Sequence, residues 1–302
     1  MDNWNDSFIA VDWGTTNRRA YRVDAGGQVV AEMEDDAGVT IVAKDGFPAA
    51  VARITERLGE APLLMAGMIG SDRGWHQASY VPCPASPADL ARNLLWVEPG
   101  RIAIVPGVAF TGEGRADVMR GEEVQVFGHM AGHDGGNALL CHPGTHTKWV
   151  RLSAGAIAEF RTFMTGELFG LLRDHSILGP LLQGHGPPDA DFLAGVDRGL
   201  AGSDLAADLF SVRAGVLLGT RARESAAGWV SGLLVGADVR GGLASFSGTG
   251  GAEKPRCVTV LGRPELNRLY CAALAHAGVL STGADGGPAF VAGMQAIRKA
   301  LT

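Results

Sequence analysis

One short turn near the start of the chain carries residue types that could bind phosphate. It runs from Asp12 to Asn17 and follows the apolar stretch Phe8 to Val11. A Gly-Thr-Thr-Asn turn between strands offers consecutive backbone N–H groups and hydroxyl donors, and phosphate oxygens fit such a concavity. Asp12 could hold a hydrated magnesium ion that bridges to the phosphates. The residues expected to bind nucleotide phosphates in this turn are Gly14, Thr15, Thr16 and Asn17.

A second turn repeats the first at an offset of 130 residues. The apolar stretch Ala138 to Cys141 leads into His142-Pro143-Gly144-Thr145-His146-Thr147-Lys148, where the Gly-Thr pair recurs. A single Gly-Thr turn is weak evidence, because such turns also build ordinary hairpins. Two copies could grip a polyphosphate, and phosphoryl transfer depends mainly on such positioning and charge neutralisation. In the second copy the expected phosphate contacts are Gly144, Thr145 and His146.

The elements around the turns repeat as well, which constrains a fold more than one motif does. Apolar and alternating runs predict antiparallel strands at 8–11, 19–23 and 28–33, and again at 138–141, 148–152 and 156–163. Further strands are expected at 63–66, 101–105 and 258–261. Helical spacing predicts helices at 47–58, 122–130, 166–172, 204–223, 265–276 and 288–301. Gly262 lies at a junction of strand, tight turn and helix.

The predicted fold class is therefore α/β, with two duplicated domains and a nucleotide and substrate cleft between them. A chain of 302 residues exceeds the usual size of a single core. A Gly/Asp/His stretch at 132–136 breaks the preceding helical pattern, so the domains are expected at 1–132 and 133–302.

Composition narrows the class of partner. The net charge of −6 provides no basic field for nucleic acid. No signal peptide or membrane-spanning apolar stretch is evident, so a cytoplasmic protein is expected. Four widely spaced cysteines, without a C-x-x-C pair, are expected to be buried free thiols: Cys83, Cys141, Cys257 and Cys271. The sequence is compatible with a homo-oligomer but does not specify one.

The sequence resembles the sugar kinase branch of the actin-like ATPase superfamily, whose domains have a ribonuclease H-like fold. Residues 8–17 look like its first phosphate motif, 142–148 like its second and 258–266 like its adenosine motif. More narrowly, five segments in order are similar to the 2-dehydro-3-deoxygalactonokinase family: Met68–Ser71, Arg73–Trp75, Met119–Glu123, Pro143–Trp149 and Phe163–Leu168. The resemblance extends from about residue 8 to residue 300.

This resemblance implies an ATP-dependent kinase that phosphorylates the terminal (C6) hydroxyl of 2-dehydro-3-deoxy-D-galactonate, with Mg2+ as cofactor. It assigns adenosine binding to Gly262. His142 stands where the superfamily's second turn usually opens with an Asp, so the metal is expected mainly on Asp12 and the phosphates. Residue types do not separate the galacto from the gluco epimer.

A hydroxyl acceptor requires a carboxylate that orients it and takes its proton. Glu123 is slightly favoured over Glu122, and Asp117 is a third candidate; acidic residues in a first helical turn can also simply complement the helix dipole. The acceptor's own carboxylate calls for a cation. The expected substrate-binding residues are Arg18, Ser71, Arg73, Trp75 and Lys148.

Besides a kinase, the sequence is compatible with two other classes of function and with one further phosphate site. The Glu122-Glu123 pair is compatible with an exopolyphosphatase-like phosphohydrolase. A non-catalytic, nucleotide-dependent sensor or assembly protein is a third class, but only seven residues before the first strand leave no room for an added DNA-binding module. Residues 248–251 could form a further phosphate turn, although a flexible loop explains them more simply.

Overall fold

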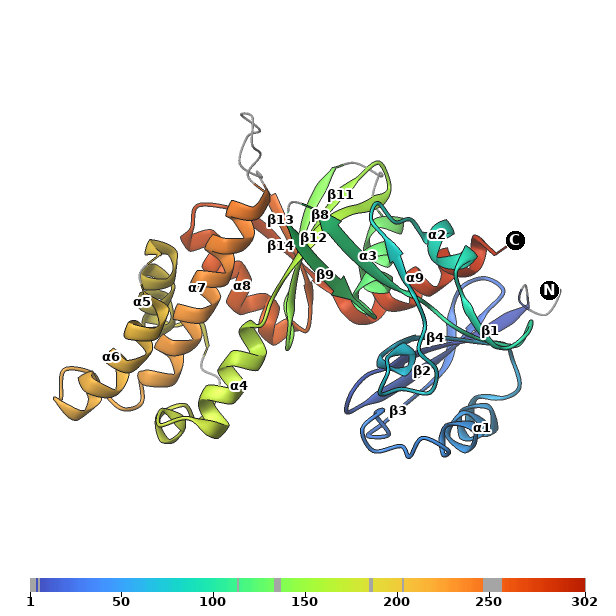
Figure 1. Cartoon of the computed structure of the whole chain (residues 1–302), viewed down its shortest axis with the longest axis horizontal. Helices are drawn as coiled ribbons and strands as arrows, with labels where there is room; N and C mark the ends of the chain where they lie inside the picture. The colour runs from blue at the N-terminus through green and yellow to red at the C-terminus, as the bar shows by residue number, and fades with distance from the viewer. Residues whose placement is uncertain are drawn as a thin grey trace. The chain divides into compact units, whose positions relative to one another are not determined.

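The structure is a computed structural model that describes residue 4 and residues 6–112, 114–132, 137–184, 187–202, 204–246 and 257–301 (Figure 1). The chain divides into two compact units. Unit 1 consists of Met1–Asn137, Leu152–Glu159 and Gly286–Thr302, and unit 2 of Ala138–Arg151 and Phe160–Asp285. This division gives the last helix to unit 1, whereas the sequence predicted one cut between residues 132 and 133. That domain boundary stays a prediction.

The main sheet of unit 1 begins with the predicted meander. Strands β1 (Ser7–Trp13), β2 (Arg18–Asp24) and β3 (Val29–Asp35) pair antiparallel, which confirms the predicted strands around the first turn. β4 (Leu63–Gly67) and β7 (Ile102–Ile104) continue the sheet in parallel, and β6 (Leu95–Glu98) closes it antiparallel. The strand order is β3-β2-β1-β4-β7-β6. The carboxyl ends of β1 and β4 therefore lie side by side, with Trp13 opposite Gly67.

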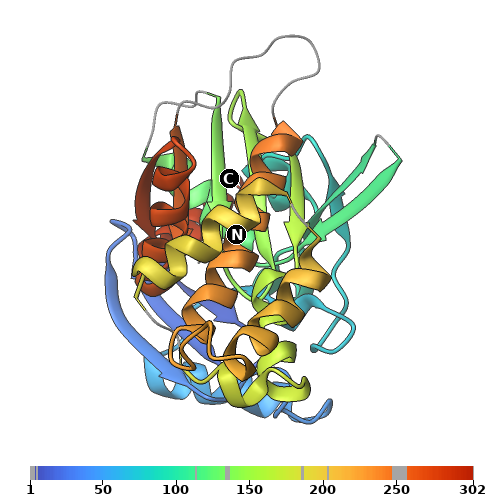
Figure 2. The same cartoon turned by 90° about the vertical axis from the view of Figure 1, so that its left-hand side faces the viewer.

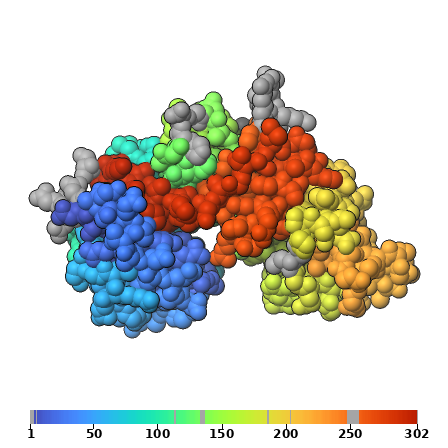
Figure 3. Space-filling view, turned by 180° about the vertical axis from the view of Figure 1, so that it is seen from behind, coloured from blue at the N-terminus to red at the C-terminus, as the bar shows by residue number. Residues whose placement is uncertain are grey.

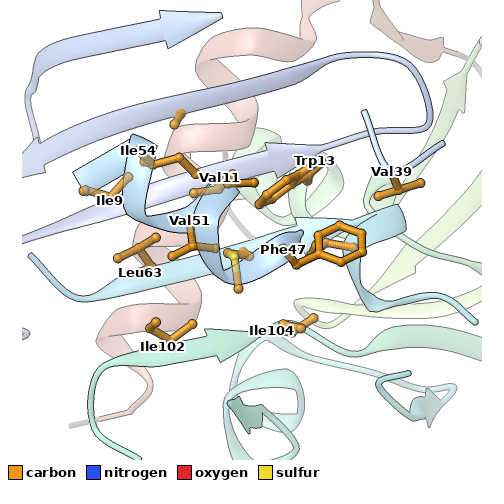
Figure 4. Close-up of a cluster of buried hydrophobic side chains, with 14 of the residues drawn as sticks. Ile9, Val11, Trp13, Val39, Phe47, Val51, Ile54, Leu63, Ile102 and Ile104 are labelled. Carbon is orange, nitrogen blue, oxygen red and sulfur yellow. The ribbon is translucent and has the colours of Figure 1, made fainter. Parts of the chain in front are cut away.

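Helix α1 (Phe47–Leu58) covers one face of this sheet, and its bounds match the prediction. Its apolar side and alternate residues of β1 form a core cluster that includes Ile9, Val11 and Trp13 (Figure 4). Each fully buried large apolar side chain contributes about 1.5–3 kcal/mol. Because residues of a strand alternate between faces, this burial fixes the opposite orientation for Asp12.

Helices α3 (Glu122–Ala131) and α9 (Gly286–Lys299) pack against each other in unit 1. A Cβ at Gly293 would lie 1.9 Å from the carbonyl oxygen of Val124, and one at Gly128 would lie 1.7 Å from that of Ala289. The two backbones are therefore in direct contact, which no side chain larger than hydrogen would permit. α9 also bonds to the start of the chain, where Arg298 donates to the carbonyl of Trp4.

The rest of unit 1 was not predicted from the sequence. Strands β5 (Tyr80–Pro82), β8 (Gly107–Gly112) and β9 (Arg115–Met119) form a small separate sheet. Helix α2 (Pro87–Arg92) begins at a Ser86–Asp89 capping box. Residues 152–159 join this unit through Ile157, which exchanges backbone hydrogen bonds with Ala85.

The sheet of unit 2 repeats the order of the first. It contains β10 (Ala138–His142), β11 (Thr147–Ser153), β12 (Ala156–Phe163), β13 (Cys257–Gly262) and β14 (Leu280–Asp285). Its order β12-β11-β10-β13-β14 corresponds to β3-β2-β1-β4-β7, with β13 and β14 parallel to β10. The duplication inferred from the two turns is thus confirmed as a repeated strand order.

Helices make up the remainder of unit 2: α4 (Thr165–His175), the 3-10 helix η3 (Gly179–Leu181), α5 (Ala190–Ala201), α6 (Leu205–Leu217), α7 (Ala226–Phe246) and α8 (Pro264–His276). α5 and α7 pack side by side (Figure 2). The segments coloured yellow to light orange, which include α5 and α6, lie at the surface in Figure 3. The predicted helix 204–223 was too long, because the chain turns at Gly219, where φ is +70°.

The cysteine prediction was only partly right. All four cysteines are free and Cys141 is buried, but Cys257 is exposed and the other two are half-buried. Burial raises the pKa of the Cys83 thiol to about 12. Within the described ranges, no helix is both long and apolar enough to cross a membrane.

Candidate active site

In the first turn the carbonyl groups accept hydrogen bonds within the protein, and we call them closed. Two of its backbone N–H groups donate to no described residue, and we call them open. The carbonyl oxygens of Gly14, Thr15 and Thr16 accept the backbone N–H groups of Val39, Thr40 and Gly38 at 3.1–3.2 Å. Among the residues the structure describes, none accepts a hydrogen bond from the amides of Thr15 or Thr16, and both residues are exposed. Removing the carbonyls' negative ends and exposing N–H groups is what an anion site requires.

The side chain of Asn17 is fixed within this turn. Its amide oxygen accepts from Thr16 Oγ1 at 2.7 Å, and its Nδ2 donates to Asp36 at 3.3 Å. Asp12 is half-buried at the end of β1. Its carboxylate would lie 3.6 Å from a Cβ at Gly67, and Gly67 has φ of +91°. A Cβ there would also lie 2.9 Å from the carbonyl oxygen of Trp13, so the chain needs glycine at this position directly beside Asp12.

The start of α3 reaches the same edge of the sheet. A Cβ at Gly121 would lie 3.1 Å from the Cα of Gly67, so the turn before α3 touches the end of β4. Gly121 has φ of +105°, a conformation that side chains rarely adopt. The fold thus brings Asp12 and the Gly121-Glu122-Glu123 motif to neighbouring positions within unit 1.

The two glutamates of this motif are in different environments. Glu123 is fully buried, and both of its carboxylate oxygens accept the Gly121 N–H, at 2.9 and 2.7 Å. Burial first, and then the neighbouring charge of Glu122, raises the pKa of Glu123 to about 8. Glu122 is half-buried and accepts the Arg120 N–H at 3.0 Å. Asp117 lies on β9, paired with Phe110 in the small sheet. Of the three, Glu122 is the one that both belongs to the motif beside Asp12 and has a partly exposed side chain.

The second turn repeats the pattern of the first at two of its carbonyl groups. The N–H of Glu167, in the first turn of α4, donates to the carbonyl oxygen of Thr145 at 2.9 Å, and Lys148 Nζ donates to that of His146 at 3.4 Å. The amides of Gly144, Thr145 and His146 donate to no group in the described part of the chain. His146 Nε2 lies 2.5 Å from Glu167 Oε2.

Gly262 lies at the end of β13, next to the second turn. A Cβ there would be 3.3 Å from the carbonyl oxygen of Pro143. Asn267 donates to the carbonyl of Gly262 at 3.1 Å and to that of Ala284 at 2.9 Å, so one side chain joins the ends of β13 and β14. The expected adenosine-binding residue and the expected phosphate turn are therefore adjacent in unit 2.

The loop expected to bind the sugar acid follows β4, beginning with the 3-10 helix η2 (Met68–Gly70). Ser71 is buried and its hydroxyl donates to the carbonyl of Met68 at 2.7 Å. Trp75 is half-buried and stacks on Phe47 of the core. Arg73 is exposed, and no hydrogen bond or ion pair joins its side chain to another residue in the described ranges.

Arg120 lies in the turn between β9 and α3 and contacts this loop. Its Nη2 donates to the carbonyl of Ala78 at 2.8 Å, and its guanidinium lies over Tyr80. Its Nη1 would be 2.9 Å from a Cβ at Gly70. One residue therefore supports the loop through its side chain and Glu122 through its backbone N–H.

The other two expected cations are engaged within the protein. Arg18 is 1% exposed, pairs with Asp35 through two nitrogens and donates to the carbonyl of Ala50. Lys148 is 4% exposed and bonds to the second turn. The accessible cation among the expected substrate residues is Arg73.

Comparison with known proteins connects this geometry to one family. The family model described as 2-keto-3-deoxy-galactonokinase matches residues 12–297. The chain belongs to this family. The 2-dehydro-3-deoxygalactonokinase of Escherichia coli strain K12 is 36% identical, over 97% of this chain and 98% of that protein.

Solved structures agree with the family. A crystal structure assigned to a 2-dehydro-3-deoxygalactonokinase of Sinorhizobium meliloti is 36% identical and has a TM-score of 0.89, covering 97% of this chain and 99% of that one. A xylulose kinase of Lactobacillus acidophilus is 10% identical, with a TM-score of 0.51 over 98% of this chain and 89% of that one, which indicates a shared fold. The repeated strand order is thus that of the actin-like ATPase fold expected from the sequence.

Several residues that shape the site were not singled out from the sequence. They are Gly67, Arg120, Glu167 and Asn267. Gly67, Arg120 and Glu167 lie in or next to the motifs that carry the family resemblance, which was the available signal. Residues 248–251, considered as a further phosphate turn, lie outside the described residues.

Proposed function

We propose that this protein transfers the terminal phosphoryl group of ATP to the C6 hydroxyl of 2-dehydro-3-deoxy-D-galactonate and forms the 6-phosphate. The observation that carries the proposal is the pair of turns with closed carbonyls and open amides, in a chain of the 2-keto-3-deoxy-galactonokinase family. Both turns have a shape suited to phosphate oxygens, and transfer of a phosphoryl group needs such positioning more than covalent chemistry. A kinase of this kind would work in the cytoplasm, where ATP is available.

Asp12 would hold Mg2+ in this proposal. Mg2+ is usually bound through one or two carboxylates together with substrate phosphates, and a half-buried carboxylate beside a phosphate turn fits that donor set. When bound, the ion would neutralise charge on the phosphate oxygens.

Glu122 is our choice for the group that orients the acceptor hydroxyl and takes its proton. Glu123, slightly favoured from the sequence, has both carboxylate oxygens on the Gly121 N–H in the buried first turn of α3. Glu122 is half-buried and held by the Arg120 N–H, so it can reach a bound molecule without unfolding the helix start. Glu122→Gln should reduce kcat at least about 100-fold, the usual loss for an essential general base.

The substrate's carboxylate would bind to Arg73, whose guanidinium is free to form a bidentate pair. Ser71 and Trp75 belong to the same loop and would contact the sugar-acid chain. Arg18 is not included, because it is buried against Asp35. Arg73→Ala should raise the KM for the sugar acid without changing the KM for ATP.

Coupled measurement of ADP release tests the proposed function directly. The acceptors to compare are 2-dehydro-3-deoxy-D-galactonate, its gluco epimer, neutral hexoses and buffer alone, with phosphorus NMR to locate the new phosphate. We expect turnover with the galacto acid and a 6-phosphate product. ADP release on neutral hexoses alone would refute the assignment.

The family match favours a kinase over the two alternatives raised by the sequence. An exopolyphosphatase-like enzyme would release phosphate from ATP or polyphosphate without an acceptor, and the buffer-only assay measures this. A non-catalytic sensor would bind nucleotide without turnover in any of the assays.

A further inference from the structure

A buried carboxylate lies within the longest helix of unit 2. Asp238 is 2% exposed on α7, a helix whose other buried residues are apolar or glycine. Burying a carboxylate costs several kcal/mol unless hydrogen bonds compensate. Burial raises the pKa of Asp238, and hydrogen bonds from Thr165, Tyr270 and Trp149 act against that rise. A group this costly needs an explanation beyond packing.

Asp238 receives donors from three different elements. Trp149 on β11 donates from Nε1 to Oδ1 at 2.7 Å. Thr165, the first residue of α4, and Tyr270 on α8 each donate a hydroxyl to Oδ2 at 2.5 Å. Tyr270 OH also lies 2.8 Å from the hydroxyl of Thr147, which must be the donor in that pair because the tyrosine's proton is directed at Asp238.

Thr147 and Thr165, which belong to this network, lie at the end of the second phosphate turn and at the start of the helix that bonds to it. Thr147 directly follows Gly144, Thr145 and His146, so Tyr270 links Asp238 to the end of the turn. Thr165 begins α4, and two residues later Glu167 closes the carbonyl of Thr145 and contacts the ring of His146. The end of the turn and the helix that closes it are therefore joined to one carboxylate.

We propose that Asp238 is a positioning residue that holds the turn 144–146 in its anion-binding shape through Thr147 and Thr165. It does not touch the nucleotide. It fixes the first residue of α4 and the start of β11, and these fix which amides of the turn stay open. This inference rests on the proposed function, in which the second turn binds nucleotide phosphate.

The alternative is that this network only stabilises the helical core. Asp208 provides the matched control, because it is another carboxylate buried in a helix of unit 2, at 5% exposure, and it pairs with Arg198. Asp208→Asn should reduce stability and leave nucleotide affinity unchanged. Thr165 allows a second comparison, since Thr165→Val removes the hydroxyl at similar size and Thr165→Ser keeps it.

Titration calorimetry of the full-length protein with a non-hydrolysable ATP analogue tests the inference. Asp238→Asn and Thr165→Val should each raise the Kd at least about tenfold, as loss of a group that orients ligand-binding atoms does. Thr165→Ser and Asp208→Asn should stay within about twofold of the parent protein. Circular dichroism and melting temperature are measured for every variant.

Each outcome is decisive. An unchanged Kd in Asp238→Asn or in Thr165→Val, at any melting temperature, overturns the positioning role. If Asp238→Asn does not fold, the Thr165→Val and Thr165→Ser pair decides by itself. Because the readout is binding of the analogue, it remains informative even if the sugar acid proves not to be a substrate, and that failure would appear separately in the ADP-release assay.

Discussion

The raised pKa of Glu123 predicts that this carboxyl makes the protein less stable as the pH rises, the opposite of the effect of a carboxylate in an ion pair. The carboxyl is fully buried at the start of α3, and its pKa rises from 4.5 to about 8 in the folded protein. In the unfolded chain it ionises near the ordinary value. Between these two values the folded state keeps a proton that the unfolded state has released. The contribution of this group to stability is therefore complete below pH 4.5 and is lost as the pH rises through 8.

The magnitude follows from the two pKa values. At about 1.4 kcal/mol for each tenfold change in proton affinity, the rise from 4.5 to about 8 corresponds to about 5 kcal/mol. Glu123→Gln replaces the carboxyl with a group that does not ionise and can still accept the Gly121 N–H. Any fixed cost of burying the amide is the same at every pH. The free energy of unfolding of the variant, relative to the parent protein, should therefore increase by several kcal/mol between pH 5 and pH 8.5.

Urea denaturation at half-unit pH steps measures this difference. Glu265→Gln is the control, because Glu265 is an exposed acidic residue in the first turn of α8. The free energy of unfolding should depend less on pH in Glu122→Gln than in the parent protein, because the charge of Glu122 contributes to the raised pKa of Glu123. A constant difference between Glu123→Gln and the parent protein across the pH range would refute the argument.

Two further predictions concern catalysis and packing. Asp12→Asn should lower kcat at least about 100-fold, as loss of a group that supports charge neutralisation does, with little change in melting temperature; normal turnover would exclude the metal role. Gly293→Ala should lower the free energy of unfolding by about 2 kcal/mol or more, because its Cβ would lie 1.9 Å from the Val124 carbonyl oxygen. Gly170→Ala in α4 is the matched control, since no atom lies within 4 Å of that Cβ, and a melting temperature for Gly293→Ala equal to that of the control would contradict the packing argument.

Local pattern predicted the elements that hold the two turns. β1 and β10 were found because each is a short apolar run that stops at a Gly/Thr turn, and α1 because its apolar residues lie on one side. α7 was missed although it is the longest helix among the described residues. Small and apolar residues lie on all of its sides, so its sequence shows no helical period. α6 was extended past Gly219 because apolar spacing alone does not reveal a positive φ.

Site residues that belong to contiguous motifs were predicted from the sequence. Those that act through contacts between distant parts of the chain were missed. The turns and the Glu122-Glu123 pair could be found because their residue types are contiguous. The backbone N–H groups that bond to the carbonyls of residues 14–16 and of Thr145 come from residues 38–40 and from Glu167, which lie more than twenty residues away along the chain. Glu123 is buried and Glu122 half-buried although they are adjacent, a difference that depends on tertiary packing and that no local pattern encodes.

The contact between α3 and α9 also orders the events of synthesis. Unit 1 is built from both ends of the chain, with α9 supplying Gly293 to α3 and Gln295 to the carbonyl of Gly27. Until residues 286–299 have been made, the first 137 residues lack the helix that packs against α3, whereas all of unit 2 precedes that helix along the chain. Unit 2 can therefore finish folding first, and unit 1 is completed only when α9 packs against α3.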